Sequence, residues 1–292
     1  MSDNEIHEDR ATVTSESVAS ARVPFWIAVG LVGIVLSPLL VGFEPVGWDP
    51  DVMYRPIKTE LARSLRVGQL PFWSEKFGLG LPLVAESHVA ALYPPNWPAY
   101  RLLDVSSAYA FQLWLHLTAT VAVTFAYARV LGIGSVGAAL SGVCFAIGGF
   151  QAAHACHEPF VMVMPYVPLC LLLAERALAT GRACWVAGLA LAWGLQLTLG
   201  HFQIQAWTAG LVALTAIWRV FTGRANRRRG LLIGLSLAWG ASIAAVQLGL
   251  TSELKREAEF DRTESMLSNY QYPPEHLAQW ALPAFYLTRN LN

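Results

Sequence analysis

Residues 23–43 read VPFWIAVGLVGIVLSPLLVGF, a run without a single charged side chain. A transmembrane helix needs about twenty consecutive apolar residues, and this run is long enough. Soon after it, GWDPDVMYRP (Gly47–Pro56) places two carboxylates, Asp49 and Asp51, where the chain leaves the lipid. Acids at this depth either mark the end of a span or take part in chemistry at the membrane surface.

The composition of the whole chain agrees with a membrane protein. Of its 292 residues, 55% are hydrophobic and only 14% are charged, and the mean hydropathy is +0.43. Soluble domains usually contain about 25% charged residues. The formal net charge is zero, so the sequence gives no sign of a nucleic-acid partner.

The hydropathy pattern predicts an all-α, polytopic membrane helical bundle with about seven transmembrane helices. Residues 1–22 are polar and lack the features of a signal peptide, so we expect a disordered cytoplasmic N-terminus. Residues 23–250 form the transmembrane domain, and residues 251–292 form an outer-face tail with a short amphipathic helix. The seven expected spans are 23–43, 108–128, 134–150, 159–177, 184–200, 203–221 and 231–250.

Small residues and prolines predict local features within these spans. Gly134, Ala138 and Gly142 recur every four residues and would allow close helix packing along one face. Pro165 and Pro168 should kink the fourth span. A polar LGHFQIQ sequence predicts a tight hairpin between the fifth and sixth spans.

The distribution of arginine predicts the orientation. With the N-terminus inside, the inner loops contain Arg129, Arg176, Arg182 and the Arg-rich GRANRRRG, whereas the short loops near 150–158 and 200–203 contain no Lys or Arg. We interpret GRANRRRG as a cytoplasmic topology anchor in preference to an anionic-lipid or nucleic-acid patch. This orientation predicts a working face on the outer side of the membrane.

The first outer loop, residues 44–107, is too long and too patterned for a simple connector. Ile57, Leu61 and Leu65 repeat every four residues with charged residues between them, which predicts an amphipathic helix lying in the membrane interface. YPPNW, from Tyr93 to Trp97, predicts a second short helix before the next span.

Charged residues in this loop suggest two interpretations. Arg55, Lys58, Arg63 and Arg66 follow closely after Asp49 and Asp51, so they could hold a lipid-borne phosphate while a carboxylate accepts a proton from a hydroxyl group. The alternative is a helix with snorkelling cations bound to anionic headgroups. Further candidates for substrate contact on the outer face are Glu86, His88, His154, His157, Glu158, His201, Gln203 and Arg262.

Several motifs occur in an order that resembles a known family. LRVGQLPFWSEKFGLGLPLVAES and ALYPPNW lie before the second span, followed by GGFQAAHACHEPFVMVMPYVPLC and GLQLTLGHFQ. This order is similar to that of the YfhO-like bacterial membrane proteins of the GT-C glycosyltransferase superfamily. The similarity extends from about Asp49 to Leu282, and its most specific part runs from Gly68 to Asn96.

The resemblance implies a GT-C-like enzyme that transfers a sugar from a polyprenyl-phosphate carrier to a polymer or glycolipid of the cell envelope. It implies that Asp49 acts as the base or orients the acceptor, with Asp51 as the second choice. The donor phosphate would be met by Arg55, Lys58 or Arg63. The Asp-Pro-Asp tripeptide also suggests a divalent metal, but we expect none, because lipid-phosphate-dependent members often need no metal.

Two other functions remain open at this point. Such relatives usually continue with more spans, so the chain is alternatively a truncated, non-catalytic remnant or an assembly partner. A lipid-carrier transporter is the other alternative. It is disfavoured because the spans are expected to contain no ionisable residue, whereas ion-coupled transport requires such groups.

Overall fold

The computed structural model describes residues 18–43 and 49–258, and the side chains of these ranges from residue 21 onward. The chain divides into two units, Met1–Leu254 and Lys255–Asn292, and the account below concerns the first. The described residues form helices, with one isolated bridge between Ser74 and Leu81. The elements are α2 (Val18–Val35), η1 (Ser37–Val41), η2 (Pro50–Tyr54), α3 (Arg55–Arg66), η3 (Ser87–Val89), α4 (Asn96–Leu102), α5 (Val105–Val130), α6 (Ser135–Ile147), α7 (Gly149–Ala153), α8 (Glu158–Val163), α9 (Tyr166–Thr180), α10 (Ala183–Leu197), α11 (Phe202–Phe221), α12 (Arg227–Ile243) and α13 (Ala245–Glu257).

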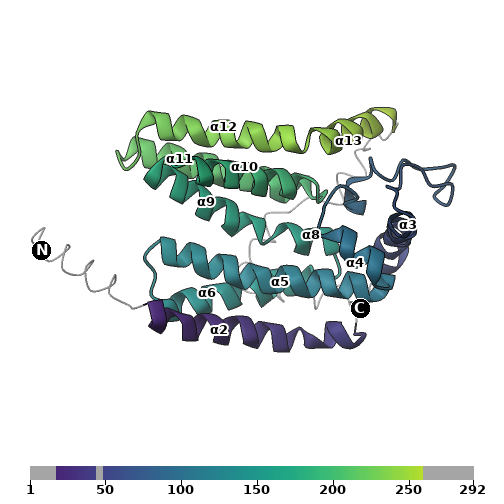
Figure 1. The fold of residues 1–292 in the computed structure, drawn as a ribbon, viewed down its shortest axis with the longest axis horizontal. Helices are drawn as coiled ribbons and strands as arrows, with labels where there is room; N and C mark the ends of the chain where they lie inside the picture. The colour runs from purple at the N-terminus through teal and green to yellow at the C-terminus, as the bar shows by residue number, and fades with distance from the viewer. Residues whose placement is uncertain (1–17, 44–48, 259–292) are drawn as a thin grey trace, which may run out of the picture. The chain divides into compact units, whose positions relative to one another are not determined.

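The all-helical architecture predicted from the sequence is confirmed, and each expected span coincides with helix (Figure 1). Within the described ranges, four helices are long and apolar enough to cross a membrane, or five if the bent pair α12 and α13 is one span. The helices over Ala21–Val35 and Ala183–Leu197 are apolar but shorter. These apolar helices indicate a membrane protein.

Several expected spans are interrupted. The helix expected over 23–43 begins earlier, at Val18, and ends at Val35, and the 3-10 turn η1 follows with Pro38 in its first turn. The expected span over 159–177 is interrupted at Pro165, since α8 ends before this residue and α9 begins after it, whereas Pro168 lies inside α9. The expected span over 231–250 is bent by 66° between α12 and α13.

Small residues bring neighbouring helices close together, as the sequence predicts for the third span. Gly142 of α6 lies against α5, where an added Cβ would be 2.8 Å from the carbonyl oxygen of Val121. Gly194 of α10 lies against α12 in the same way, 2.9 Å from the carbonyl oxygen of Gly240. Contacts of this kind stabilise helix pairs in membranes, where burial of apolar surface provides little driving force.

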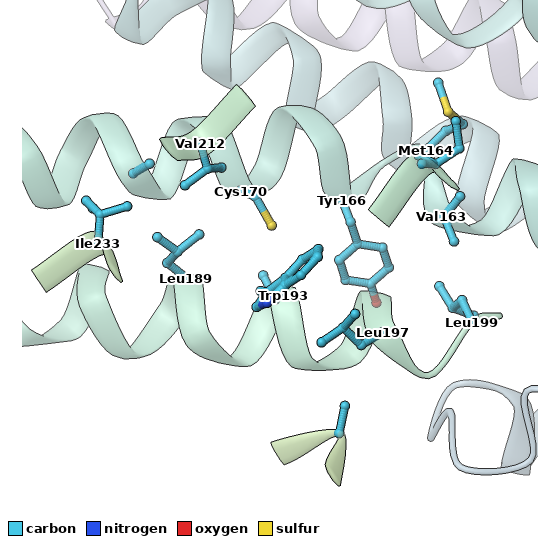
Figure 2. Close-up of a cluster of buried hydrophobic side chains, with 14 of the residues drawn as sticks. Val163, Met164, Tyr166, Cys170, Leu189, Trp193, Leu197, Leu199, Val212 and Ile233 are labelled. Carbon is cyan, nitrogen blue, oxygen red and sulfur yellow. The ribbon is translucent and has the colours of Figure 1, made fainter. Parts of the chain in front are cut away.

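The largest apolar cluster is formed by α8 to α12. Figure 2 shows Cys170 and Tyr166 of α9 directed toward α10, whose Leu189 and Trp193 meet them. Cys170 is fully buried there as a free thiol, and it acts as a small apolar packing residue. This cluster fixes the position of the α10–α11 hairpin, which carries His201.

A second apolar cluster joins the first loop to the start of α5. Ile57, Leu61 and Leu65 of α3 are buried in it, which confirms an amphipathic helix, although its apolar face packs against the protein and the expectation placed it in the membrane interface. The predicted second helix is α4, and its Tyr100 is fully buried. The first loop therefore folds against α5 and α8, and α3 and α4 are its helices.

Candidate functional site

The site predicted from the sequence is built where η2 and α3 of the first loop meet the N-terminal ends of α8 and α11. Tyr100 of α4 contacts Glu158 of α8 through a 2.8 Å hydrogen bond, which joins the loop to the bundle. The α10–α11 hairpin also contacts the first loop. At Gly200 the two backbones are so close that an added Cβ would be 2.5 Å from the backbone of Ser87. Segments that are distant in the sequence thus converge at one end of the helices (Figure 1).

The Asp49 carboxylate forms a partly exposed polar pair that joins the first loop to α8. Its Oδ2 lies 3.0 Å from Nε2 of His157, and the side chains are 41% and 35% exposed, respectively. Asp49 directly precedes η2, and His157 directly precedes α8. On its other side, His157 Nδ1 lies 3.3 Å from the thiol of Cys156. A carboxylate held by an imidazole and open to solvent is suited to accept a proton from a hydroxyl group.

Asp51 lies in a different environment. Its carboxylate is 3.2 Å from the guanidinium of Arg55 one turn later, and it is 49% exposed. Arg63 is directed to solvent, 59% exposed, and pairs with Glu60 at 3.2 Å. Of the two acids that flank Pro50, only Asp49 is joined to a polar residue of another helix by an ion pair that the structure describes.

Lys58 and Glu158 form an ion pair in the interior, at 2.9 Å, with both side chains fully buried. The Lys58 ammonium also donates to the carbonyl oxygen of Val89 at 3.1 Å and lies 5.4 Å from the ring centre of Tyr100. Neither charged side chain is accessible to a ligand in this structure, although the sequence placed both among the substrate contacts. Their physical role here is to attach α3 to α8.

The burial of Lys58 follows from its position on α3. Lys58, Leu61, Ala62 and Leu65 lie three to four residues apart and share one face of the helix, and all are buried. The sequence pattern shows this spacing, but it does not show the partner, since Glu158 lies on a helix far along the chain. Grouping Lys58 with the exposed charges of α3 was therefore wrong.

Tyr54 lies among the acidic groups of the site. Burial, and then the nearby charges of Asp49 and Glu158, hold the pKa of its phenol well above the usual value. Burial and the hydrogen-bonded Glu158 carboxylate raise the pKa of Tyr100 in the same way. Both phenols therefore remain protonated, so their hydroxyl groups can donate hydrogen bonds and their rings provide apolar surface.

Four histidines surround the outer part of the site: His88, His154, His157 and His201. The His154 ring stacks on Phe160 with centroids 4.2 Å apart, and His201 meets the same phenyl ring edge-on at 4.6 Å. Burial lowers the pKa of His201, and the neighbouring histidines lower it further. This grouping confirms that the loops containing these residues lie at one end of the helices.

Glu86 and His88 form a local pair within the first loop. The Glu86 carboxylate accepts hydrogen bonds from the backbone N–H of His88 at 3.1 Å and from its ring Nδ1 at 3.0 Å. Burial would raise the pKa of Glu86, but these hydrogen bonds outweigh it, so the pKa lies below the usual value. The ring of His88 reaches Tyr54, with centroids 6.3 Å apart, and so borders the site.

Two candidates remain, Gln203 and Arg262. Gln203 is exposed in the first turn of α11, whereas the buried amide of the hairpin belongs to Gln205, which donates to Gln196. Arg262 lies outside the described residues. Within the ranges that the structure describes, no group of three or more His, Cys, Asp or Glu side chains has the arrangement of a metal site.

A buried hydrogen-bonded chain was missed in the sequence. Tyr93 OH lies 2.8 Å from both Nε2 of His116 and the hydroxyl of Tyr166, and Nδ1 of His116 lies 2.8 Å from the carbonyl oxygen of Gln112. His116 is in the middle of α5, so the premise that the spans contain no ionisable residue is wrong. A histidine within an apolar run was the available signal.

Comparisons of the sequence with known proteins give no relative: no protein-family model matches the chain, and no curated protein is significantly similar to it.

Proposed function

We propose that the chain is a GT-C-like membrane glycosyltransferase that moves a sugar from a polyprenyl-phosphate carrier to a cell-envelope acceptor. The observation that carries this proposal is the Asp49–His157 pair, partly exposed at the end of the helices where the first loop meets α8 and α11. The order of motifs around it, from Gly68 to Asn96, resembles that of the YfhO-like proteins and supports the same proposal.

In the proposed reaction, Asp49 Oδ2 accepts the proton of an acceptor hydroxyl group. The acceptor oxygen forms a bond to the anomeric carbon of the sugar as the bond from that carbon to the phosphate oxygen breaks. The polyprenyl phosphate leaves with the electron pair, and the sugar configuration is inverted. His157 positions the Asp49 carboxylate through the 3.0 Å contact, and it becomes the partner of the protonated acid.

The donor phosphate needs a cation that a ligand can reach. Lys58 is buried against Glu158, and Arg63 is paired with Glu60 on the exposed face of α3. Arg55 is also paired, with Asp51 at 3.2 Å, but it is 30% exposed and is the one of the original three nearest in sequence to the proposed base Asp49. We therefore assign the phosphate contact to Arg55, with His88, His154 and His201 bordering the space for the sugar and the acceptor.

The proposal includes seven spans, with the N-terminus in the cytoplasm and the Asp49 end on the periplasmic or extracellular side of a bacterial inner membrane. Arginines at the opposite ends of the helices support this orientation. The other two spans would be the shorter apolar helices over Ala21–Val35 and Ala183–Leu197, in addition to the four long helices and the bent pair α12 and α13.

The test replaces Asp49 by Asn in a strain that has no other copy of the protein, and measures sugar modification of the envelope glycans. Asp51→Asn is the matched control, because it removes the same charge from the neighbouring position. We expect loss of modification with Asp49→Asn and its retention with Asp51→Asn, at equal protein levels in the membrane. Full modification by Asp49→Asn would contradict the assignment of the base.

A further inference from the structure

A group of arginines lies at the ends of α9, α11 and α12 that are remote from Asp49. A helix rises about 1.5 Å per residue, so α11, from Phe202 beside the site to Phe221, separates the two ends by its full length. In the stretch from Arg129 to Arg229 the only acids are Glu158 and Glu175. The same stretch contains many more arginines, and they lie at this end: Arg129, Arg176, Arg182, Arg219, Arg224, Arg227, Arg228 and Arg229.

Three of these arginines are engaged within the protein, and the first is Arg129, which donates to the carbonyl oxygen of Ile133 at 2.9 Å. Arg219 binds the largely buried Glu175 with two nitrogens, at 2.9 Å and 3.2 Å from Oε1. Arg229 donates to the carbonyl oxygens of Leu178 and Ala179, at the C-terminal end of α9. Because Glu175 is used by Arg219 and Glu158 by Lys58, no acid of this stretch is left to neutralise the other arginines.

Arg176, Arg224, Arg227 and Arg228 are exposed, and none of them has an ion-pair partner in the part of the chain that the structure describes. Arg176, Arg219 and Arg224 converge on a small pocket of about 210 Å³ that Glu175 also lines. This end of the helices therefore has a positive charge that the described ion pairs do not neutralise.

An apolar groove of about 670 Å³ lies beside these charges, between α11 and α12. Three of its side chains, Ile217, Phe221 and Leu231, are 65%, 85% and 70% exposed. Arg227 is part of its lining. Volumes of about 300–1,000 Å³ are typical of ligand sites, so the groove has the size of one.

We propose that this end of the protein is a binding site for an anionic phospholipid. The acyl chain lies in the groove between α11 and α12, and Arg227 and Arg224 bind the phosphate of the headgroup. Arginine suits this role because its planar guanidinium donates two parallel hydrogen bonds to a phosphate. The N-terminus of α12, which begins at Arg227, adds the partial positive charge of its backbone N–H groups.

The charge of the site favours an anionic over a zwitterionic headgroup. Basic pockets between membrane helices bind anionic lipid headgroups, and Lys and Arg close to an anionic membrane surface are attracted to it. A simple topology anchor also needs arginines, but it does not need an apolar groove beside them, and it would not bind one lipid molecule in a saturable way. The site requires no transfer chemistry, so it stands independently of the proposed function.

The experiment uses the full-length protein, purified in a neutral detergent, and measures bound phosphatidylglycerol and phosphatidylcholine by native mass spectrometry. We expect the wild-type protein to bind phosphatidylglycerol in preference. The double variant Arg224→Gln/Arg227→Gln should bind it at least about tenfold more weakly, as two lost arginine contacts require. The control Lys76→Gln/Arg101→Gln removes two exposed charges from the first loop and should bind it as the wild type does.

Two further measurements test the groove. Leu231→Trp fills the groove, leaves the arginines unchanged, and should weaken binding. Inorganic phosphate in excess should not displace the bound lipid. Equal binding of the two lipids by the wild-type protein, wild-type affinity in the arginine double variant, or displacement by inorganic phosphate would each overturn the proposal. If the double variant does not fold, the two single variants and the lipid preference of the wild type decide it.

Discussion

Oδ2 of Asp49 lies 3.0 Å from Nε2 of His157, although the two residues come from the first loop and from the start of α8. This contact links the acid that follows the first apolar run to a histidine of the AHACHEP sequence. It distinguishes Asp49 from Asp51, which pairs only with Arg55 within its own segment among the described ion pairs. The difference in partners is the structural reason for placing the chemistry at Asp49.

The buried pair between Lys58 and Glu158 should be essential for stability. Lys58→Met leaves the Glu158 carboxylate buried without its cation, and breaking such a pair costs about 3–5 kcal/mol. Lys76→Met is the control, because it removes the exposed partner of Glu60, and exposed pairs contribute about 0–1 kcal/mol. Thermal unfolding in detergent measures both changes. Equal unfolding temperatures of the two variants would contradict the role given to Lys58.

Removing both partners should restore much of the stability. The double variant Lys58→Met/Glu158→Leu buries no charge, and buried ion pairs are often replaced by apolar residues without loss. Its unfolding temperature should therefore exceed that of Lys58→Met alone. A double variant that is less stable than the single variant would show that Glu158 has a structural role apart from Lys58.

Gly200 should be intolerant of any side chain. Its φ of +79° lies in the left-handed region, and a Cβ would be 2.5 Å from the carbonyl carbon and oxygen of Ser87. Gly200→Ala should therefore be less stable than Gly223→Ala, which has a similar φ of +71° but no atom within 4 Å of the added Cβ. The control isolates the cost of the backbone conformation, about 1–2 kcal/mol. Similar unfolding temperatures for the two variants would exclude close contact between the hairpin and the first loop.

Acidification should destabilise the protein through His201. Its folded-state pKa is lowered from 6.5 by burial and by His88, His154 and His157, so the unfolded state binds more protons below that pH. Stability should fall as the pH drops from about 7 to about 5, and less so in His201→Gln. Glu86, whose folded pKa is below 4.5, loses its stabilising effect only at lower pH. An identical pH dependence in His201→Gln would contradict this assignment.

The sequence was a good guide to the helices, because their signals are local. The apolar runs, Pro165 and the polar hairpin before α11 each determine structure within a few residues. The spacing of Ile57, Leu61 and Leu65 likewise predicted α3 correctly. The lengths were less predictable, since Pro38 and the bend at Ala244 shorten helices that hydropathy alone would continue.

The pairing of polar side chains was not predictable, because it depends on contacts between distant segments. The orientation argument grouped Asp49, His157 and His201 at one end, but it did not show that Asp49 contacts His157 or that Lys58 is buried against Glu158. His116 was overlooked because its neighbours in α5 are apolar. Its partner Tyr93 belongs to the YPPN sequence, which was interpreted only as the start of a helix.

The most direct test of the central claim is sugar transfer by the purified, reconstituted protein from a labelled polyprenyl-phosphate hexose to an envelope acceptor. General base catalysis contributes about 10²–10⁴ to a rate. The account therefore predicts that Asp49→Asn lowers the initial rate at least about a hundredfold, whereas Asp51→Asn retains most of it. Equal rates for Asp49→Asn and the wild-type protein would contradict the claim that Asp49 is the base. Absence of transfer by the wild-type protein from every polyprenyl-phosphate donor would contradict the proposed function itself.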